Sequence, residues 1–200
     1  MLLVRHGETE WNLEGRYQGG LDSPLTERGV AQAHAIGRLL GTLPEAVSAA
    51  IVASPLGRAR RTAEIIRGHL AAETKLEFDD RLREISLGSW DGLTRHEIAA
   101  RSPGIFAGDG RREWYFRSPD GETDEGFSAR IGEWLSEPVE ARVLIVVTHG
   151  VVSRILRGQY AGLAREAALR LAVPQDGIFR LTGGAIEAIA APIGPAKRGT

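Results

Sequence analysis

Residues 142–150 read Arg-Val-Leu-Ile-Val-Val-Thr-His-Gly and form the most apolar stretch of the chain. The apolar residues do not alternate with polar ones, which is typical of a central parallel strand buried on both faces, and we place that strand at residues 142–147. Shorter apolar runs at residues 1–4 and 50–53 predict two more strands. Helical periodicity follows at residues 26–40 and 54–70, so strands and helices alternate along the chain.

The remaining segments continue this alternation. Helical patterns occur at residues 94–101, 123–135 and 151–160, an extended segment at 75–85, and a hairpin signal at Gly183-Gly184, where strands 178–181 and 185–190 are expected to add edges to the sheet. Thr26 is expected to cap one helix, and Ser54, followed by Pro55, another. We therefore predict an α/β fold, a three-layer α/β/α sandwich with a mostly parallel central sheet. Residues 1–191 would form one domain, and residues 192–200 a mobile tail.

The charge balance and the lack of cysteine exclude several classes of protein. The 200 residues carry 25 basic and 26 acidic side chains, a net charge of -1, which argues against a nucleic-acid binder and against a lysine-rich membrane-surface module. The chain contains no Cys, which excludes disulfides, thiolate nucleophiles and cysteine-ligated metals. The longest apolar runs fall far short of the ~20 residues of a membrane span, and the first residues lack the pattern of a signal peptide. We expect a cytoplasmic location.

Two His-Gly pairs are the first sign of chemistry. His6-Gly7 follows the strand at residues 1–4, and His149-Gly150 follows the strand at residues 142–147. Ligands of open α/β sheets bind beyond the carboxyl ends of the strands, so this placement favours a site. The other histidines, His34, His69 and His96, are expected to be simply solvated.

Arginine provides the second sign, because 23 of the 25 basic residues are Arg. Most are expected to face water, Arg60 and Arg61 among them, since such a skew is usually a matter of genome composition. Arg58 is different, because it lies in the first turn of a helix, where a cation is disfavoured unless an anion binds there. Arg5 stands beside His6 at the end of an apolar strand, where it would clamp an oxyanion. Metal binding is the rival use of the histidines, but two Arg in one pocket would repel a cation. We expect no metal and no cofactor.

The motifs resemble those of a known family. The similar segments are residues 3–12 (Leu-Val-Arg-His-Gly-Glu-Thr-Glu-Trp-Asn), 16–19, 22–26 with Gly29, 54–59 with Thr62 and Ala63, 82–85 with Gly88 and residues 90–92, 121–123, and 148–150. Their order is that of the histidine phosphatase superfamily, the group that includes the cofactor-dependent phosphoglycerate mutases, and residues 16–19 resemble its phosphatase branch. The resemblance implies a phosphoglycerate mutase-like fold.

It also implies a role for each matching residue. His6 would be the nucleophile that forms a phosphohistidine, and Arg5, Arg58 and His149 would surround the oxygens of the transferred phosphoryl group. Asn12 would add a neutral donor, and Gln18, Gly19 and Gly150 would complete the substrate-binding set. Glu84 would protonate the leaving oxygen and then assist water. Without the family pattern, Asp79, Asp80, Asp91 and Glu122 are equal candidates for this acid.

The expected function is hydrolysis of small phosphorylated metabolites through phosphohistidine, without metal. The segment at about residues 102–119 is a short lid, whereas mutases of the family resemble one another in a longer insertion that excludes water. The alternatives are phosphoglycerate mutase-type transfer and a non-catalytic phosphate-binding module. The only expected partner is the substrate, with neither nucleic acid nor membrane, although the edge of the final hairpin leaves a homodimer open.

Aromatic residues gather in this lid beside arginines. The cluster consists of Phe106, Trp114, Tyr115 and Phe116 with Arg111, Arg112 and Arg117. Two interpretations stay open at this point. The aromatic rings could anchor the lid on the core, or they could form a pocket wall for apolar or ring-shaped leaving groups.

Overall fold

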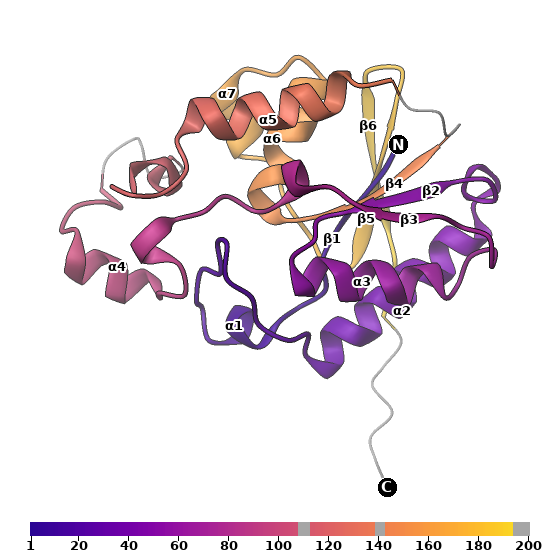
Figure 1. Ribbon diagram of the computed structural model, residues 1–200, viewed down its shortest axis with the longest axis horizontal. Helices are drawn as coiled ribbons and strands as arrows, with labels where there is room; N and C mark the ends of the chain where they lie inside the picture. The colour runs from indigo at the N-terminus through magenta and orange to yellow at the C-terminus, as the bar shows by residue number, and fades with distance from the viewer. Residues whose placement is uncertain (108–112, 139–142, 194–200) are drawn as a thin grey trace, which may run out of the picture.

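A computed structural model of the chain describes residues 1–107, 113–138 and 143–193 and contains one six-stranded sheet (Figure 1). The strands are β1 (Leu2–Arg5), β2 (Ala50–Ala53), β3 (Leu76–Phe78), β4 (Leu144–Thr148), β5 (Gly177–Thr182) and β6 (Ala185–Ala190). Their order in the sheet is β3-β2-β4-β1-β5-β6. The β3-β2, β2-β4 and β4-β1 pairs are parallel, and the β1-β5 and β5-β6 pairs are antiparallel. The mostly parallel sheet was therefore predicted correctly.

The apolar strand near residue 145 lies in the middle of this sheet. All five residues of β4 are buried, and the strand pairs with β2 on one side and β1 on the other. It begins and ends later than the predicted 142–147, and Arg142 lies outside the described residues. A strand covered on both faces needs apolar residues at every position, so the unbroken apolar run correctly predicted a buried central strand.

Helices cover both faces of the sheet. The helices α2 (Glu27–Thr42) and α3 (Gly57–Arg67) lie together on one face (Figure 1), where Ile36 and Ile66 pack with Leu2 and Val4 of β1. On the other face, α5 (Asp124–Ser136) and α6 (Gly150–Tyr160) share a core with Leu3 of β1, and α7 (Arg165–Leu169) packs against α6. The result is the predicted three-layer sandwich.

Short elements at one end of the molecule surround the carboxyl ends of β1 and β4. They are α1 (Glu10–Leu13), α4 (Arg95–Arg101) and the 3-10 helices Asp80–Leu82, Gly88–Trp90 and Trp114–Arg117. A further 3-10 helix, Pro44–Ala46, lies elsewhere and precedes β2. Four-residue and three-residue helices carry too little periodicity to be read from sequence, and only α4 was expected. Among the described residues, every helix is too short or too polar to cross a lipid bilayer.

Three local predictions were wrong. The helix after β2 begins at Gly57 rather than at Pro55, and Leu56 takes the N-cap position without a side-chain cap, while the Ser54 hydroxyl bonds the ring of His149. The segment predicted to be extended at residues 75–85 is a strand only at Leu76–Phe78, because Asp79 then caps a 3-10 turn. In the final hairpin β5 pairs with β1, so only β6 is an edge strand.

Candidate active site

The two predicted histidines meet at the carboxyl ends of neighbouring parallel strands. Arg5 stands opposite Thr148 in the β1-β4 register, and His6 N donates to Thr148 O at 2.9 Å. This register places the rings of His6 and His149 side by side, with centroids 5.2 Å apart and planes tilted by 56°. Residues separated by 143 positions in the chain thus form one centre, as the matching His-Gly contexts suggested.

His6 is held in the tautomer that a nucleophile needs. Its Nδ1 lies 2.8 Å from Gly7 O, and because a carbonyl can only accept, Nδ1 carries the proton and Nε2 keeps its lone pair. The side chain is buried, and burial, together with the positive charges of Arg58 and Arg5, lowers the pKa of His6 well below its ordinary value. The ring is therefore neutral near pH 7.

His149 is fixed by a residue that the sequence analysis had assigned to a helix cap. Its Nε2 lies 2.7 Å from Ser54 Oγ, and both side chains are fully buried. Burial, Arg58 and His6 lower the pKa of His149 well below its ordinary value. Its Nδ1 is buried without a hydrogen-bond partner among the described residues.

Arg58 is a buried cation that the backbone of the loop before α2 holds in place. The side chain is 2% exposed. Its Nη1 donates to Leu21 O at 2.6 Å and to Asp22 Oδ1 at 3.1 Å, and its Nη2 donates to Gly19 O at 2.9 Å. These bonds fix the plane of the guanidinium group and leave Nε, which has no partner in the described part of the chain.

Arg5 is held in a similar way from the opposite side. Its Nη1 donates to Val173 O at 2.7 Å, while its Nε is buried and unpartnered within residues 1–107, 113–138 and 143–193. Burial lowers the pKa of Arg5 to about 10 despite the opposing effect of Glu84, so the side chain stays charged at neutral pH.

Three buried nitrogen atoms close to His6 thus have no hydrogen-bond partner among the described residues: Arg5 Nε, Arg58 Nε and His149 Nδ1. Leaving a buried donor unpaired costs about 1–3 kcal/mol, so a ligand that accepts hydrogen bonds from these atoms would bind favourably. Two fixed guanidinium groups and an imidazole are suited to bind an anion that has several oxygen atoms. This arrangement suits a phosphoryl group attached to or approaching His6 Nε2.

Glu84 follows the 3-10 helix Asp80–Leu82, and its carboxyl group lies at the N-terminus of α6. Its carboxylate oxygens accept hydrogen bonds from Val151 N at 3.1 Å and Val152 N at 3.3 Å. Gly150 lies next to this contact, since a Cβ there would be in ordinary van der Waals contact with Glu84 Oε2 at 3.7 Å and Arg5 Nε at 3.8 Å. The amides of the helix N-terminus orient the carboxyl group next to Arg5.

The other acidic residues that the sequence left open have structural partners. Asp79 pairs with Arg81, Asp80 with Arg83, and Glu122 with Arg130, while Asp91 accepts from Leu87 N and Gly20 N. Glu84 alone of the five lines the cavity described next.

A small cavity of about 110 Å³ opens at this centre. It is lined by Arg5, His6, Asn12, Arg16, Tyr17, Gln18, Gly19, Arg58, Glu84, Ile85, Leu87, Tyr115 and Val151. Drug-sized ligands occupy about 300–1,000 Å³, so this space suits a phosphoryl group with a short leaving group.

Of the remaining predicted binding residues, Asn12 has a group available to a ligand, whereas Gln18 and Gly19 support the structure of the cavity. Asn12 Oδ1 accepts from Gln175 Nε2 at 3.2 Å, so its amide NH₂ group is the part available to a ligand. Gln18 also lines the cavity, but its side chain already bonds Thr9 Oγ1 at 2.8 Å and accepts from Ser23 Oγ. Gln18 therefore shapes the wall. Gly19 has φ +52°, and its carbonyl orients Arg58.

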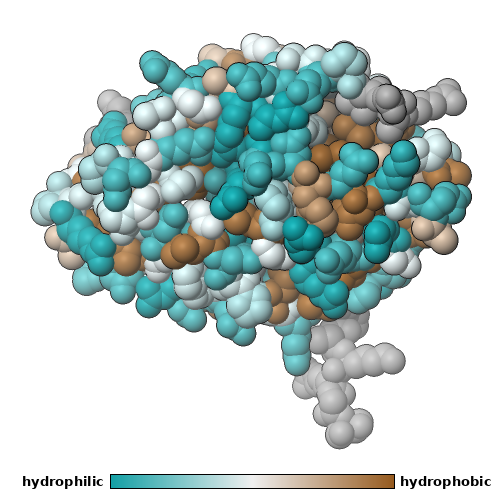
Figure 2. All heavy atoms as spheres, viewed as in Figure 1, coloured by the Kyte–Doolittle hydropathy of each residue, from teal (hydrophilic) through white to brown (hydrophobic). Residues whose placement is uncertain are grey.

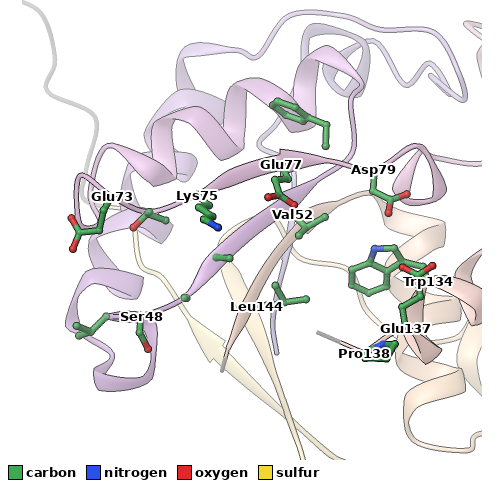
Figure 3. Close-up of a pocket in the computed structure, with 15 residues that line it drawn as sticks. Ser48, Val52, Glu73, Lys75, Glu77, Asp79, Trp134, Glu137, Pro138 and Leu144 are labelled. Atoms are coloured by element: carbon green, nitrogen blue, oxygen red, sulfur yellow. The ribbon is translucent and has the colours of Figure 1, made fainter. Parts of the chain in front are cut away.

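A larger hollow of about 710 Å³ lies beside β2 and β3 (Figure 3). Its apolar lining includes Val52, Trp134 and Leu144, and apolar atoms gather over these strands on the right of the view in Figure 2. The charged groups at its rim are mainly acidic, with Glu73 and Glu77 among them. Such a rim repels a phosphate dianion, so the larger hollow is not the anion site.

Several residues of the site were missed by the sequence analysis. Ser54 fixes His149, Asp22 fixes Arg58, and Gln175 donates to His6 O at 3.0 Å. Tyr115 was noted as aromatic but not as a cavity residue. Ser54 and Asp22 lie inside the matching segments 54–59 and 22–26, and this membership was the only sequence signal that could have pointed to them.

The other histidines lie apart from this centre. His96 is exposed, as expected. His34 is also exposed, as expected, and its Nδ1 lies 2.9 Å from Nε2 of the partly exposed His69, which follows α3.

Comparison with known proteins places this geometry in a family. The model of the histidine phosphatase superfamily (branch 1) matches residues 1–185. The chain belongs to the histidine phosphatase superfamily. The chain is 39% identical over 189 residues to the protein named probable phosphoglycerate mutase GpmB from Citrobacter koseri, which covers 90% of this chain and 82% of the relative.

Solved structures of the superfamily share the fold of this histidine phosphatase. The structure of YhfR from Bacillus stearothermophilus has a TM-score of 0.78 and 34% identity, covering 94% of both chains. A mycobacterial glucosyl-3-phosphoglycerate phosphatase has a TM-score of 0.72 and 28% identity, covering 90% of this chain and 87% of its own. The resemblance seen in the sequence is confirmed.

Proposed function

We propose that this histidine phosphatase hydrolyses small phosphomonoesters through a phosphohistidine on His6. The observation that carries the proposal is the free Nε2 of His6 beside three buried nitrogen atoms without a partner among the described residues, Arg5 Nε, Arg58 Nε and His149 Nδ1. His149 Nδ1 donates in the tautomer in which Nε2 accepts from the Ser54 hydroxyl. A phosphoryl group presents three oxygens around phosphorus, which matches the number of donors. The donors are already ordered, so little reorganisation is needed as the phosphoryl group transfers.

The reaction has two steps that balance. In the first, His6 Nε2 forms a bond to phosphorus, the ester P–O bond breaks, and Glu84 in its acid form gives its proton to the leaving oxygen. In the second, a water oxygen attacks phosphorus, the P–N bond breaks, and the Glu84 carboxylate takes the proton of the water. Gly7 O holds the proton on Nδ1 throughout.

Mutase activity is the second candidate, because the curated relatives are named phosphoglycerate mutases. Both reactions share the first step and differ in whether water or a second alcohol receives the phosphoryl group. The short lid at about residues 102–119 favours water, since a mutase must keep water away from phosphohistidine. The solved mycobacterial neighbour named as a phosphatase also supports hydrolysis.

Phosphate release from a panel of sugar, glycerol and aryl phosphates tests the proposal. The wild type is expected to release phosphate and to carry an acid-labile phosphoryl group on His6 after a rapid quench. His6→Ala should abolish both, whereas His96→Ala, a matched change at an exposed histidine, should abolish neither. Equal release by His6→Ala and the wild type would refute the phosphohistidine route.

The same assay separates the two candidates. With 3-phosphoglycerate as substrate, a phosphatase releases inorganic phosphate and glycerate, and a mutase produces 2-phosphoglycerate instead. Phosphate release without isomerisation is the expected result. Isomerisation that outpaces phosphate release would assign the chain to the mutases. Binding of phosphate without either product would leave only a phosphate-binding module.

Glu84→Gln tests the acid directly. An alkoxide needs a proton as it leaves and an aryl oxide needs it far less, so the variant should lose about 100-fold in kcat on glycerol phosphate and much less in formation of phosphohistidine from phenyl phosphate. Equal losses on both would mean that Glu84 is not the acid.

A further inference from the structure

The lid aromatics divide into anchors and one cavity residue. Trp114 is 3% exposed and packs on Tyr17, with ring centroids 4.5 Å apart, in the core that also contains Phe127. Phe116 packs on Phe127 with centroids 5.9 Å apart. Tyr115, between the two anchors, lines the active-site cavity instead. Most of the aromatic cluster therefore anchors the lid, and the side chain that reaches the site has a polar tip.

The Tyr115 hydroxyl is held by a cation of α6. Arg154 of α6 donates from Nε to Leu171 O at 2.9 Å and from Nη1 to Tyr115 Oη at 2.9 Å. A guanidinium group can only donate, so the hydroxyl accepts this bond and its own proton points elsewhere. That proton has no acceptor among the residues that the structure describes.

Tyr115 lines the same cavity as Glu84, the proposed acid for the leaving oxygen, and the charge of Glu84 acts on Tyr115. Burial is the main cause that raises the pKa of Tyr115 above its ordinary value, so the phenol remains a donor throughout the neutral range. An oriented donor next to the general acid meets the alcohol portion of the substrate and not the three outer phosphoryl oxygens.

We propose that Tyr115, oriented by Arg154, donates a hydrogen bond to a second oxygen on the leaving alcohol. The preferred substrates would then be phosphomonoesters whose alcohol carries a hydroxyl or carboxylate close to the ester, and not apolar alkyl esters. This inference rests on the proposed function and names its substrate class. Tyr115 is the specificity-determining residue, and Arg154 is a positioning residue that acts through it.

The test compares two esters of equal carbon number, glycerol 3-phosphate and n-propyl phosphate. They differ in the two hydroxyls that Tyr115 could bind, so the ratio of their kcat/KM values isolates the contact. The wild type is expected to prefer glycerol 3-phosphate by at least tenfold, and Tyr115→Phe to reduce that ratio about tenfold, mainly through KM. Tyr160→Phe is the matched control, because its hydroxyl contacts Gly184 N in the final hairpin.

Arg154→Gln tests the same contact without any change to the Tyr115 side chain. It should lower the same ratio in the same direction, and the double variant with Tyr115→Phe should lower it no further, because both changes remove one contact. A purely structural role would lower kcat/KM for both esters equally. 3-Phosphoglycerate in the same series shows whether carboxylate or hydroxyl oxygens are preferred.

The outcomes are distinct. A wild-type ratio near one, or a ratio unchanged within twofold by Tyr115→Phe, overturns the inference. Hydrolysis of phenyl phosphate with no activity on either three-carbon ester also overturns it, while the proposed function stands. No phosphate release from any ester, with no phosphoryl group on His6, is instead a failure of the proposed function.

Discussion

Acidification should destabilise the ligand-free protein through its two active-site histidines. His6 and His149 are almost entirely buried, and burial and Arg58 lower the pKa of each well below its ordinary value. In the unfolded chain the same side chains titrate near pH 6.5. Below that pH both histidines are therefore protonated in the unfolded chain but remain neutral in the folded protein. Their contribution to stability is intact above pH 6.5 and is lost as the pH falls toward the folded-state pKa values.

The magnitude follows from linkage. A histidine that stays neutral in the folded protein at pH 5 reduces the free energy of unfolding by about 1.9 kcal/mol between pH 7 and pH 5. The pair therefore accounts for up to about 4 kcal/mol, which is a large part of the roughly 5–15 kcal/mol that stabilises an ordinary domain.

Urea unfolding in phosphate-free buffer at pH 7, 6 and 5 measures this loss. The wild type is compared with His149→Gln, which removes one of the two groups, and with His96→Gln, which removes an exposed histidine. The loss from pH 7 to pH 5 should be about 1.9 kcal/mol smaller in His149→Gln than in the wild type and unchanged in His96→Gln. Carboxylates contribute equally to all three proteins and cancel in the comparison.

The reasoning fails if the wild type and His149→Gln lose the same stability, because His149 would then be protonated in the folded state. Inorganic phosphate gives a second check. An anion that binds the arginines favours the positive form of His149, so phosphate should reduce the pH dependence as well as stabilise the fold.

Three further predictions concern the support of the site. Ser54→Ala frees His149 Nε2 and should lower kcat/KM about tenfold in a phosphate-release assay, equivalent to about 1.4 kcal/mol, without a loss of secondary structure by circular dichroism. Gly19→Ala places a Cβ 1.6 Å from Asp91 Oδ1 at φ +52° and should lower both the melting temperature and activity, whereas in Gly20→Ala the contact with Asp91 is 3.3 Å and the effect should be smaller. Phosphate release should be unchanged by EDTA, because the arginines supply the positive charge; a loss that added metal restores would contradict this.

The sequence was informative wherever a residue's role is local. The buried strand β4 and the His-Gly pairs could be recognised because each signal lies within a few neighbouring residues. The N-cap Thr26 follows the same rule, since a cap acts within one turn. The family motifs then supplied the choice of Glu84, which charge and position alone left among five acids.

Roles that depend on distant parts of the chain were not predictable in this way. Ser54 looked like a helix cap because it precedes Pro55, yet its partner is 95 positions away in His149. Gln175 reaches His6 O across 169 positions. Neither residue lies in a pattern of its own, so only the fold brings them to the site.

The arginines show how a chain with a net charge of -1 builds a positive pocket. Arg5, Arg154 and Arg157 donate to the consecutive carbonyls of residues 173, 171 and 172, and among the described residues none of the three pairs with a carboxylate. Carbonyl dipoles satisfy guanidinium donors without cancelling their charge, whereas a carboxylate would neutralise it. The positive charges of Arg5, Arg154 and Arg157 therefore gather around the segment 171–173, and Arg5 also lines the cavity. Surface arginines such as Arg61 and Arg170 are paired with Glu instead. The positive charge without a carboxylate partner therefore remains where it can attract a phosphate dianion.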